Sequence, residues 1–382
     1  MTKLLYIDPG LDGLNNHHSS IYLPIIRQLL KKKFEITSIV NKAFSIKENL
    51  GDNLIKAFSV NCDTNISKDP ISGWITNYIK TSETFSKELS SNVNILDFDI
   101  VFCNSFNANL LYGFKKYLNN IKFSTKKSNT KIFVELPLPP GFKIEGDTLI
   151  PEYNEAYLYR HSICELNNYN LILGSFCKET SWAYEKCFNL KFYYFPIPRK
   201  FKANLNPKFI SFLGAQRKNK GLEILPGIVN RLAKINHPVL IHDSPPGNPI
   251  LKLLEDKNPK INYMPLLASE KKWEELIASS KIIVLPYNPN RYKYSYSSIF
   301  IEAVYNGIPC IVPNNTSMSS IYQEALLSEK LTFDKWSIES IFDTLEKAIS
   351  NYSEISKKTI NLSKTWKDKN SPEKFIDFLE DN

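Results

Sequence analysis

The sequence predicts an α/β protein built of two doubly wound domains. Short apolar runs of strand length alternate with longer amphipathic stretches, a pattern typical of parallel sheets covered by helices on both faces. The chain has 382 residues and 43% hydrophobic content, enough for two cores. A polar run with two X-Pro steps, FPIPRKFKANLNPK at residues 195–208, separates a finishing strand from a starting one and marks the boundary.

The alternation continues through both halves of the chain. In the first half we expect strands at residues 3–8, 34–40, 99–104, 131–136, 170–175 and 192–195, and helices at 19–32, 106–118, 155–167 and 178–187. In the second half we expect strands at 209–214, 239–243, 261–264, 282–287, 310–313 and 331–333, and helices at 222–233, 270–279, 299–306, 318–326 and 338–350. These elements assign residues 1–198 to the first domain, 199–360 to the second, and 361–382 to a helical C-terminal segment.

The charge of the chain favours phosphate-bearing partners over nucleic acid. The net charge of +9 divides into +5 for residues 1–200 and +4 for the rest, with no basic tail or arginine cluster. Nucleic-acid binding usually concentrates positive charge on one face. A phosphate-bearing substrate or an anionic membrane surface suits an evenly basic protein better. The longest apolar runs are too short to span a membrane, and the chain enters a strand at once, so no signal peptide is expected.

Cysteines and aspartates do not form a metal-binding pattern. The six cysteines stand at positions 62, 103, 164, 177, 187 and 310 without metal-type spacing, which indicates reduced thiols in a cytoplasmic protein. Asp97 and Asp99 have the spacing of a metal-binding pair. They precede their strand, however, whereas a site at the carboxyl end of a strand needs the opposite order. We therefore predict no metal.

The segment from Lys281 to Pro313 carries the strongest functional signal. An apolar strand opens into a loop rich in Tyr and Ser, and a short helix follows, with Glu302 near its start. Gly307 and Pro309 end this helix before a second strand. Ligands of open α/β sheets collect beyond the carboxyl ends of strands, and the first turn of the helix offers backbone N–H groups to an anion such as phosphate.

The run SSIFIEAVYNGIPCIVP resembles the donor-binding segment of GT-B glycosyltransferases, most closely the retaining nucleotide-sugar enzymes of group 1. The resemblance implies that Ser297, Ser298 and Ile299 contact a diphosphate through backbone N–H groups, and that Glu302 binds ribose hydroxyls. The family usually carries a further glutamate eight residues earlier, against the donor sugar, where this chain has Tyr294. A solvated helix glutamate and an ordinary serine N-cap are the plain alternatives.

A second loop, FLGAQRKNKGLEIL at residues 212–225, supplies cations. A strand ends at Gly214, and Arg217 and Lys220 follow, where two positive charges could neutralise a leaving diphosphate. The loop resembles the Gly-Arg…Lys-Gly loop of the family. Because Ala215 follows the glycine here, Arg217 takes the place of the family's arginine. Solvated loop charges are the alternative.

The nucleotide base is placed by resemblance alone. It is expected against the loop after the strand INYM, at Met264 and Leu266, mostly through backbone contacts. Asp243 ends a neighbouring strand in the turn HDSPPGNP, and a turn-forming aspartate is the preferred explanation for it.

The first strand–helix unit is the expected acceptor side. The strand ends at Asp8, and a long loop containing Gly13 and Asn16 leads to His17 and His18 at the start of a helix. The helix dipole favours the neutral imidazole there. Many GT-B sequences are similar, with a Gly-rich loop and a histidine step opening the first helix. Polar capping residues are the alternative.

Three more side chains are candidates for the acceptor side. Glu135 ends the strand KIFVELP, and Arg160 and His161 belong to the patch YLYRH, which could equally be an amphipathic helix surface. In a retaining reaction the departing phosphate helps to take the acceptor proton, and the protein supplies positioning and charge stabilisation. An inverting reaction needs a general base, for which Glu135 or His17 would be tested first.

Together the motifs and the resemblance imply a GT-B, metal-independent hexosyltransferase, and the resemblance alone implies that it is retaining. It would move a sugar from a nucleotide-activated donor to a glycan or lipid-linked acceptor, in bacterial-type surface polysaccharide or glycoconjugate synthesis. No cofactor is expected beyond the nucleotide-sugar substrate. The predicted location is cytoplasmic, with possible peripheral contact with the inner face of the membrane. The alternatives are an enzyme of the nucleotide-sugar 2-epimerase type and a catalytically inactive GT-B-like binding protein.

Overall fold

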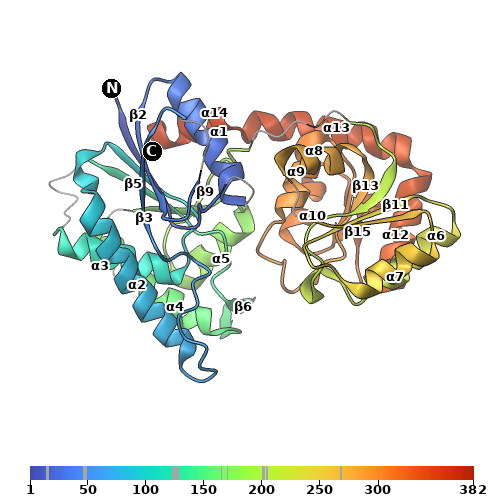
Figure 1. Ribbon diagram of the computed structural model, residues 1–382, viewed down its shortest axis with the longest axis horizontal. Helices are drawn as coiled ribbons and strands as arrows, with labels where there is room; N and C mark the ends of the chain where they lie inside the picture. Colours follow the sequence, from blue (N-terminus) through green and yellow to red (C-terminus); the bar gives the residue numbers. More distant parts are fainter. Residues whose placement is uncertain are drawn as a thin grey trace. The chain divides into compact units, whose positions relative to one another are not determined.

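The computed structural model describes residues 1–13, 17–45, 50–122, 129–164, 166–169, 171–199, 203, 205–266 and 269–382. The chain divides into two compact units (Figure 1). Unit 1 comprises Met1–Arg199 together with Asn370–Asn382, and unit 2 comprises Lys200–Lys369. The first division falls one residue after the expected position. Residues 361–369 continue a helix of unit 2, and only the segment from Asn370 groups with unit 1.

Unit 1 is built on a parallel sheet, as its alternating pattern predicts. Its strand order is β3-β2-β1-β4-β5-β8-β9. The strands are β1 (Lys3–Asp8), β2 (Glu35–Asn41), β3 (Asn53–Phe58), β4 (Ile100–Cys103), β5 (Lys131–Glu135), β8 (Ile172–Ser175) and β9 (Tyr193–Tyr194). The chain first builds outward from β1 to β2 and β3, then returns to the other side of β1 with β4. The order therefore reverses between β1 and β4, the position at which ligands bind in such sheets.

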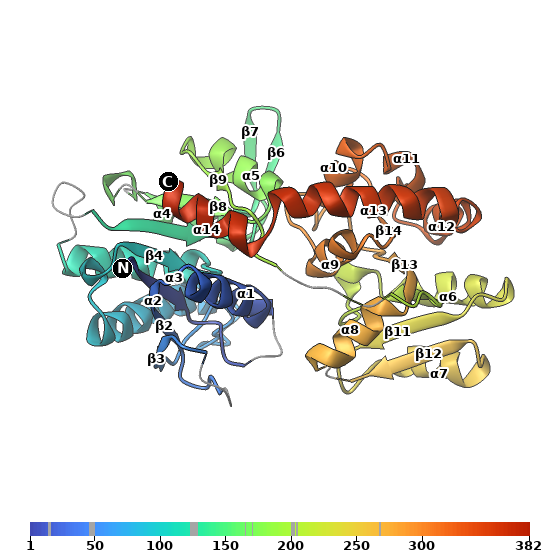
Figure 2. The same cartoon turned by 90° about the horizontal axis from the view of Figure 1, so that it is seen from above.

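Helices cover both faces of this sheet. They are α1 (His17–Lys31), α2 (Gly73–Asn92), α3 (Ala108–Asn120), α4 (Asn154–Ile163), α5 (Lys178–Phe188) and α14 (Pro372–Asp381), with short 3₁₀ turns at Ile95–Asp97 and Leu166–Tyr169. A separate hairpin joins β6 (Phe142–Glu145) to β7 (Thr148–Pro151). Figure 2 shows α14 beside α1. There Lys32 Nζ lies 2.8 Å from Asp377 Oδ1, and Phe375 is fully buried, its ring centroid 4.9 Å from that of Phe102.

The sequence pattern did not reveal α2, β3 or the β6–β7 hairpin of unit 1, nor the helices at Pro249–Lys257 and Ser328–Leu331 of unit 2, and α4 ends four residues before the expected position. The reason is clearest for α2, because its buried face includes Gly73, Thr81, Ser82 and Ser86 as well as apolar side chains. These small polar residues interrupt the apolar helical period on which the prediction depends. They also allow close packing: a Cβ on Gly113 of α3 would lie 2.7 Å from the Ser82 carbonyl oxygen.

Unit 2 contains a second parallel sheet, of order β12-β11-β10-β13-β14-β15. Its strands are β10 (Phe209–Phe212), β11 (Val239–Asp243), β12 (Ile261–Pro265), β13 (Ser280–Val284), β14 (Cys310–Pro313) and β15 (Thr332–Phe333). Its helices are α6 (Leu225–Lys234), α7 (Pro249–Lys257), α8 (Glu270–Ala278), α9 (Ser298–Asn306), α10 (Ser317–Glu324), α11 (Ser328–Leu331), α12 (Ile338–Ser350) and α13 (Tyr352–Lys369), with a 3₁₀ turn at Lys218–Lys220. Its strand order reverses between β10 and β13.

Among the described residues, no helix combines the length and the apolar character that a bilayer crossing requires.

Candidate functional site

Unit 1 gathers a buried polar cluster where its strand order reverses. Asp8 ends β1, Asn104 follows β4, Glu135 ends β5, and His18 lies in the first turn of α1. We call these four residues the Asp8 cluster. Each is buried, with 0 to 3% of its surface exposed. Burial of four polar side chains costs free energy unless they are hydrogen-bonded, so their contacts define the site.

Donors surround the Asp8 carboxylate. His18 Nδ1 lies 2.8 Å from Oδ1, and the backbone N–H of Gly10 donates to the same oxygen at 3.0 Å. The Asn104 amide and the Tyr6 hydroxyl donate to Oδ2 at 2.8 and 3.2 Å. Gly10 is needed because a Cβ there would lie 2.2 Å from His18 Cε1. The loop therefore closes tightly over the imidazole.

His18 carries a proton at neutral pH. Burial of the ring alone would lower its pKa, but the Asp8 carboxylate outweighs burial and raises the pKa of His18 to about 10, with a smaller contribution from the Cys62 thiol. This corrects the expectation of a neutral imidazole, which considered the helix dipole and left out the carboxylate. The imidazolium can donate a hydrogen bond but cannot accept a proton.

Glu135 is the uncharged acid of the cluster. Burial raises its pKa to about 8, although the Ser105 N–H donates to its Oε2 at 2.9 Å. Glu135 Oε1 and Asn104 Oδ1 are buried without a hydrogen-bond partner among the described residues. Unsatisfied buried atoms of this kind point to a water molecule or a ligand group. At neutral pH the cluster holds one carboxylate, one imidazolium and one neutral acid.

Of the other acceptor-side candidates, Arg160 and His161 lie on α4 and not in this cluster. Asn16 lies outside the described residues, and His17 is the first residue of α1. Gly13 has open space where a Cβ would stand. Arg160 and His161 are exposed on α4, and His161 Nδ1 lies 2.8 Å from the Tyr78 hydroxyl of α2. His161 thus contacts the neighbouring helix α2.

Unit 2 brings several expected donor-site residues together at the end of β10. Gly214 has φ +89°, and a Cβ there would lie 2.7 Å from Ile299 Cδ1 and 3.6 Å from Lys220 Nζ. Lys220 Nζ lies 5.4 Å from the centroid of the Tyr287 ring. Burial, and then the nearby charge of Arg217, lower the pKa of Lys220 to about 8. The surroundings of Lys220 therefore favour the uncharged amine over the ammonium ion.

Hydrogen bonds link Glu302 to the same corner. Glu302 is 8% exposed, and its Oε2 accepts from the Trp273 indole N–H at 2.6 Å. The Trp273 ring meets the His242 ring edge-on, with centroids 5.4 Å apart. His242 Nδ1 accepts from the Gly214 N–H at 3.3 Å, so Nε2 carries the hydrogen and donates to the Leu266 carbonyl at 3.0 Å. Burial lowers the pKa of His242, which keeps the ring neutral.

The remaining donor-site candidates lie at the margins of this corner. Ser297 is the N-cap residue of α9, its Oγ is 3.5 Å from the Tyr287 hydroxyl, and Ser298 begins the helix. Tyr294 is half-buried, with the Lys293 ammonium 5.1 Å from its ring centroid. Met264 pairs with His242 in the sheet.

Asp243 and Arg217 have simpler surroundings. Asp243 Oδ1 accepts the backbone N–H groups of Gln216 and Ser244, each at 2.8 Å, which is the loop-forming role expected of it. Arg217 is exposed, directly before the 3₁₀ turn that carries Lys220.

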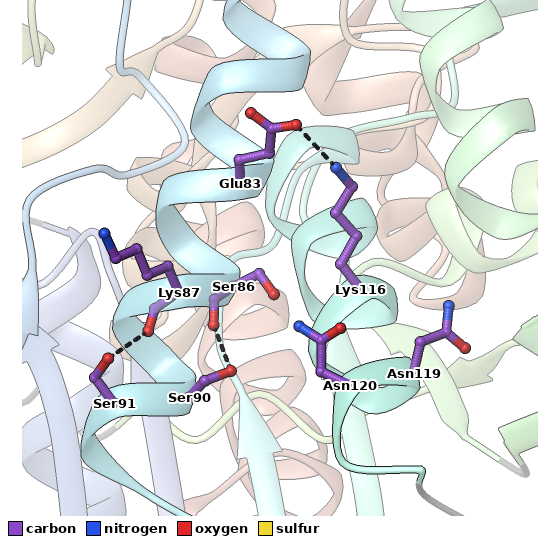
Figure 3. A pocket seen from close by; sticks show the side chains of 8 residues that line it. All are labelled: Glu83, Ser86, Lys87, Ser90, Ser91, Lys116, Asn119 and Asn120. Carbon is purple, nitrogen blue, oxygen red and sulfur yellow. Dashed lines mark hydrogen bonds and ion pairs between the residues drawn. The ribbon is translucent and has the colours of Figure 1, made fainter.

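A groove of about 610 Å³ lies between α2 and α3, apart from these residues (Figure 3). It is lined by Glu83, Ser86, Lys87, Ser90, Ser91, Lys116, Asn119 and Asn120. Lys116 and Glu83 form an ion pair of 3.2 Å across it. None of the residues predicted for chemistry lines the groove, and we assign no reaction to it. In the part of the chain that the structure describes, no group of three or more His, Cys, Asp or Glu residues could hold a metal ion.

Comparisons with known proteins identify the fold. No protein-family model and no curated protein sequence matches the chain. Solved structures do match: HepE of Anabaena in complex with UDP and glucose has a TM-score of 0.65 at 10% identity, covering 100% of this chain and 99% of that one. The fold is GT-B. A glycosyltransferase of Rickettsia africae shares this GT-B fold with a TM-score of 0.62 at 13% identity, with 100% and 98% of the two chains covered.

A protein domain named for a different activity also matches this chain. The N-terminal domain of trehalose-6-phosphate phosphatase from Candida albicans has a TM-score of 0.67 at 11% identity, covering 100% of this chain and 96% of that one. At these identities the likeness establishes the two Rossmann-like sheets and leaves the chemistry to be argued from residues.

Sequence reasoning missed four residues of these two sites: Asp8 as a partner of His18, Asn104, His242 and Trp273. Asp8 and His242 had a signal, because both stand in the last two positions of a strand before a loop. Asn104 directly follows a strand and could have been found in the same way. No signal in the sequence marks Trp273, since a tryptophan in an amphipathic helix usually indicates packing alone.

The buried acid of the Asp8 cluster predicts a pH dependence of stability. Between pH 4.5 and about 8 Glu135 keeps its proton in the folded state and loses it in the unfolded state, so the free energy of unfolding falls as pH rises. Glu135→Gln removes this dependence. Relative to wild type, the variant should gain about 1 kcal/mol or more between pH 5 and pH 8, measured by urea unfolding. Parallel curves for the two proteins would contradict the assignment.

Proposed function

We propose that this protein is a glycosyltransferase that takes its sugar from a nucleoside diphosphate donor bound in unit 2. The observation that carries the proposal is the corner at the end of β10. There Gly214, Lys220 and Ile299 are adjacent. Gly214 donates a hydrogen bond to His242, the His242 ring packs edge-on against Trp273, and Trp273 donates a hydrogen bond to Glu302. The combination of a cation, a helix N-terminus and a carboxylate suits a diphosphate followed by a ribose diol.

Each part of the donor has a proposed partner. The diphosphate lies against Gly214 and Lys220, near the start of α9 at Ser297 and Ser298, with Arg217 at the solvent side. The ribose hydroxyls bond to Glu302. The base lies along Met264 and Leu266, and the sugar approaches Tyr294. The structure of HepE contains UDP and glucose, and UDP is therefore the first nucleotide to test.

A binding anion would also relieve the electrostatic cost at Lys220. The ammonium is held where burial and Arg217 favour its neutral form, so a diphosphate supplies the negative charge that this position lacks. As the nucleoside diphosphate departs, negative charge grows on the leaving oxygen, and the attraction between that oxygen and the Lys220 ammonium strengthens. An interaction that is stronger in the transition state than in the bound substrate accelerates the reaction.

We propose that the Asp8 cluster in unit 1 serves the acceptor. His18 is protonated and Glu135 is neutral at pH 7, so both donate hydrogen bonds and neither takes a proton. This supports a retaining reaction. The acceptor oxygen bonds to the anomeric carbon on the face from which the phosphate oxygen departs, and the acceptor proton passes to that phosphate. An inverting reaction would need the deprotonated form of one of these groups as its base.

We further propose that unit 1 contacts an anionic membrane that presents a lipid-linked acceptor. Ile71, two residues before α2, and Ile75 and Ile79 within it recur every four residues, and are 84%, 42% and 42% exposed. Lys68 and Lys80 are exposed beside them and complement an anionic surface. Because α2 leads into β4, it starts at the sheet edge that holds the Asp8 cluster. Lipid-linked substrates would therefore arrive at the reacting side of unit 1.

The competing function is a GT-B-like binding protein without catalysis. The observation in its favour is Tyr294, which stands where related enzymes carry a glutamate against the sugar. Both functions predict nucleotide binding at Glu302, and they differ in turnover of a nucleotide sugar.

Nucleotide binding is the first test of this function. UDP, among UDP, GDP and ADP, should raise the thermal unfolding midpoint, and Glu302→Ala should weaken its affinity about 10-fold or more, because a hydrogen bond to a charged group is lost. Release of UDP from a UDP-sugar in the presence of acceptor would then separate the transferase from the binding protein. Absence of stabilisation by all three nucleotides would contradict the proposal.

Lys220 predicts a pH dependence of nucleotide affinity. The pKa of the free site is about 8, below the ordinary 10.5, and binding needs the charged ammonium. Above pH 8 the protein must take up a proton to bind, so UDP affinity should fall by up to about tenfold per pH unit. Lys220→Arg stays charged and should show a flat profile from pH 7 to 9.5 by calorimetry. An equally steep decline in this variant would assign the titration to another group.

Membrane contact is tested with vesicles. The wild type should co-sediment with vesicles containing phosphatidylglycerol and not with pure phosphatidylcholine. Ile71→Glu combined with Ile75→Glu should lower the bound fraction several-fold, since charges replace inserted side chains. Ile250→Glu is the matched control, because Ile250 is 56% exposed on α7 of unit 2. Equal loss in the control would refute a specific contact through α2.

A further inference from the structure

Trp273 connects two parts of the nucleotide site that are distant in sequence. It is the fourth residue of α8 and is half-buried. Its indole N–H donates to Glu302 Oε2 at 2.6 Å, and its ring meets the His242 ring edge-on at an interplanar angle of 75°. An indole has one donor and no acceptor, so its polar atom can serve only a group that accepts. A carboxylate on the neighbouring helix is such a group.

Helix α8 is held by contacts that do not involve the site. Leu276 and Ile277 are buried at 2% and 0% exposure, and the Ser269 side chain caps the helix by accepting the Lys272 N–H at 3.3 Å. The indole is therefore presented by an anchored element. Its hydrogen bond restrains the rotamer of the Glu302 side chain.

His242 extends this restraint to the rest of the corner. The same ring that packs on Trp273 receives the Gly214 N–H and donates to the Leu266 carbonyl. The rings of His242 and Trp273 thus contact the proposed phosphate loop at Gly214, the proposed base loop at Leu266 and the carboxylate of Glu302. Neither ring was assigned a role by the sequence.

We infer that Trp273 is a positioning residue of the nucleotide site. It holds the Glu302 carboxylate in the orientation that receives the ribose hydroxyls, and with His242 it sets the place of that carboxylate relative to Gly214. The inference rests on the proposed function, because the ribose contact of Glu302 belongs to that proposal.

The test compares two ligands that differ only at the ribose. Calorimetry measures the binding of UDP and of 2′,3′-dideoxyuridine diphosphate, which lacks both hydroxyls. Trp273→Phe keeps an aromatic ring and loses the N–H. It should bind UDP about 5- to 10-fold more weakly than wild type and the dideoxy ligand within about twofold, as expected for one hydrogen bond to a charged group. Trp273→His, which restores a ring N–H, should recover part of the loss.

A double-mutant cycle shows whether the effect passes through Glu302. Trp273→Phe combined with Glu302→Gln should bind UDP no more weakly than Glu302→Gln alone. Trp74→Phe is the control, since the Trp74 indole also donates a hydrogen bond, to the Ile71 carbonyl at 3.1 Å in unit 1. Its UDP affinity should equal that of wild type.

The outcomes separate this inference from the function on which it rests. If the wild type binds neither ligand, the proposed function fails and the inference fails with it. If the wild type binds UDP and Trp273→Phe binds it equally well, the inference alone is overturned. The same holds if the variant loses affinity for both ligands by one factor, because that result indicates a general structural effect.

Discussion

The parallel direction of the strands in both large sheets is the constraint from which the rest of this structure follows. Every strand ends at the same edge of its sheet, and every loop into the next helix begins there. The polar residues at the ends of strands in the two sites, such as Asp8, Glu135 and His242, therefore lie at that edge. Asp8 and Gly214 stand at corresponding places, each on or just after the first strand of its unit, beside the point where strand order reverses. The topology of each sheet therefore determines where its site lies, whichever side chains stand there.

The two sites use this common position with opposite electrostatics. In unit 1 the Asp8 carboxylate has its donors within the protein, and the His18 cation is stabilised by it. In unit 2 the Lys220 cation lies where burial disfavours its charge. In the first arrangement the charges of Asp8 and His18 compensate each other within the protein. In the second, the diphosphate of the proposed function would supply the negative charge that stabilises the Lys220 ammonium.

The sequence predicted the sheets well because their strands are short apolar runs bounded by turn residues. The proximity of Gly214, Lys220 and Ile299 could be anticipated because these residues sit in strand–loop–helix units that local pattern describes. It failed at α2, whose buried face includes Thr81 and Ser82, since period detection needs apolar side chains. It also misjudged the charge of His18, because the controlling partner, Asp8, is ten residues away across a loop, and local pattern does not show which side chains meet in space.

Unit 2 is continuous in sequence, whereas unit 1 is not. Phe375, Ile376 and Leu379 of α14 belong to the interior of unit 1, and they are synthesised after the whole of unit 2. On the ribosome, the usual order in which the N-terminal domain matures first is therefore reversed. Residues 1–199 must wait with an incomplete core while unit 2 can already close. Until α14 is made, the rings of Phe102 and Phe176 lack their aromatic partner Phe375.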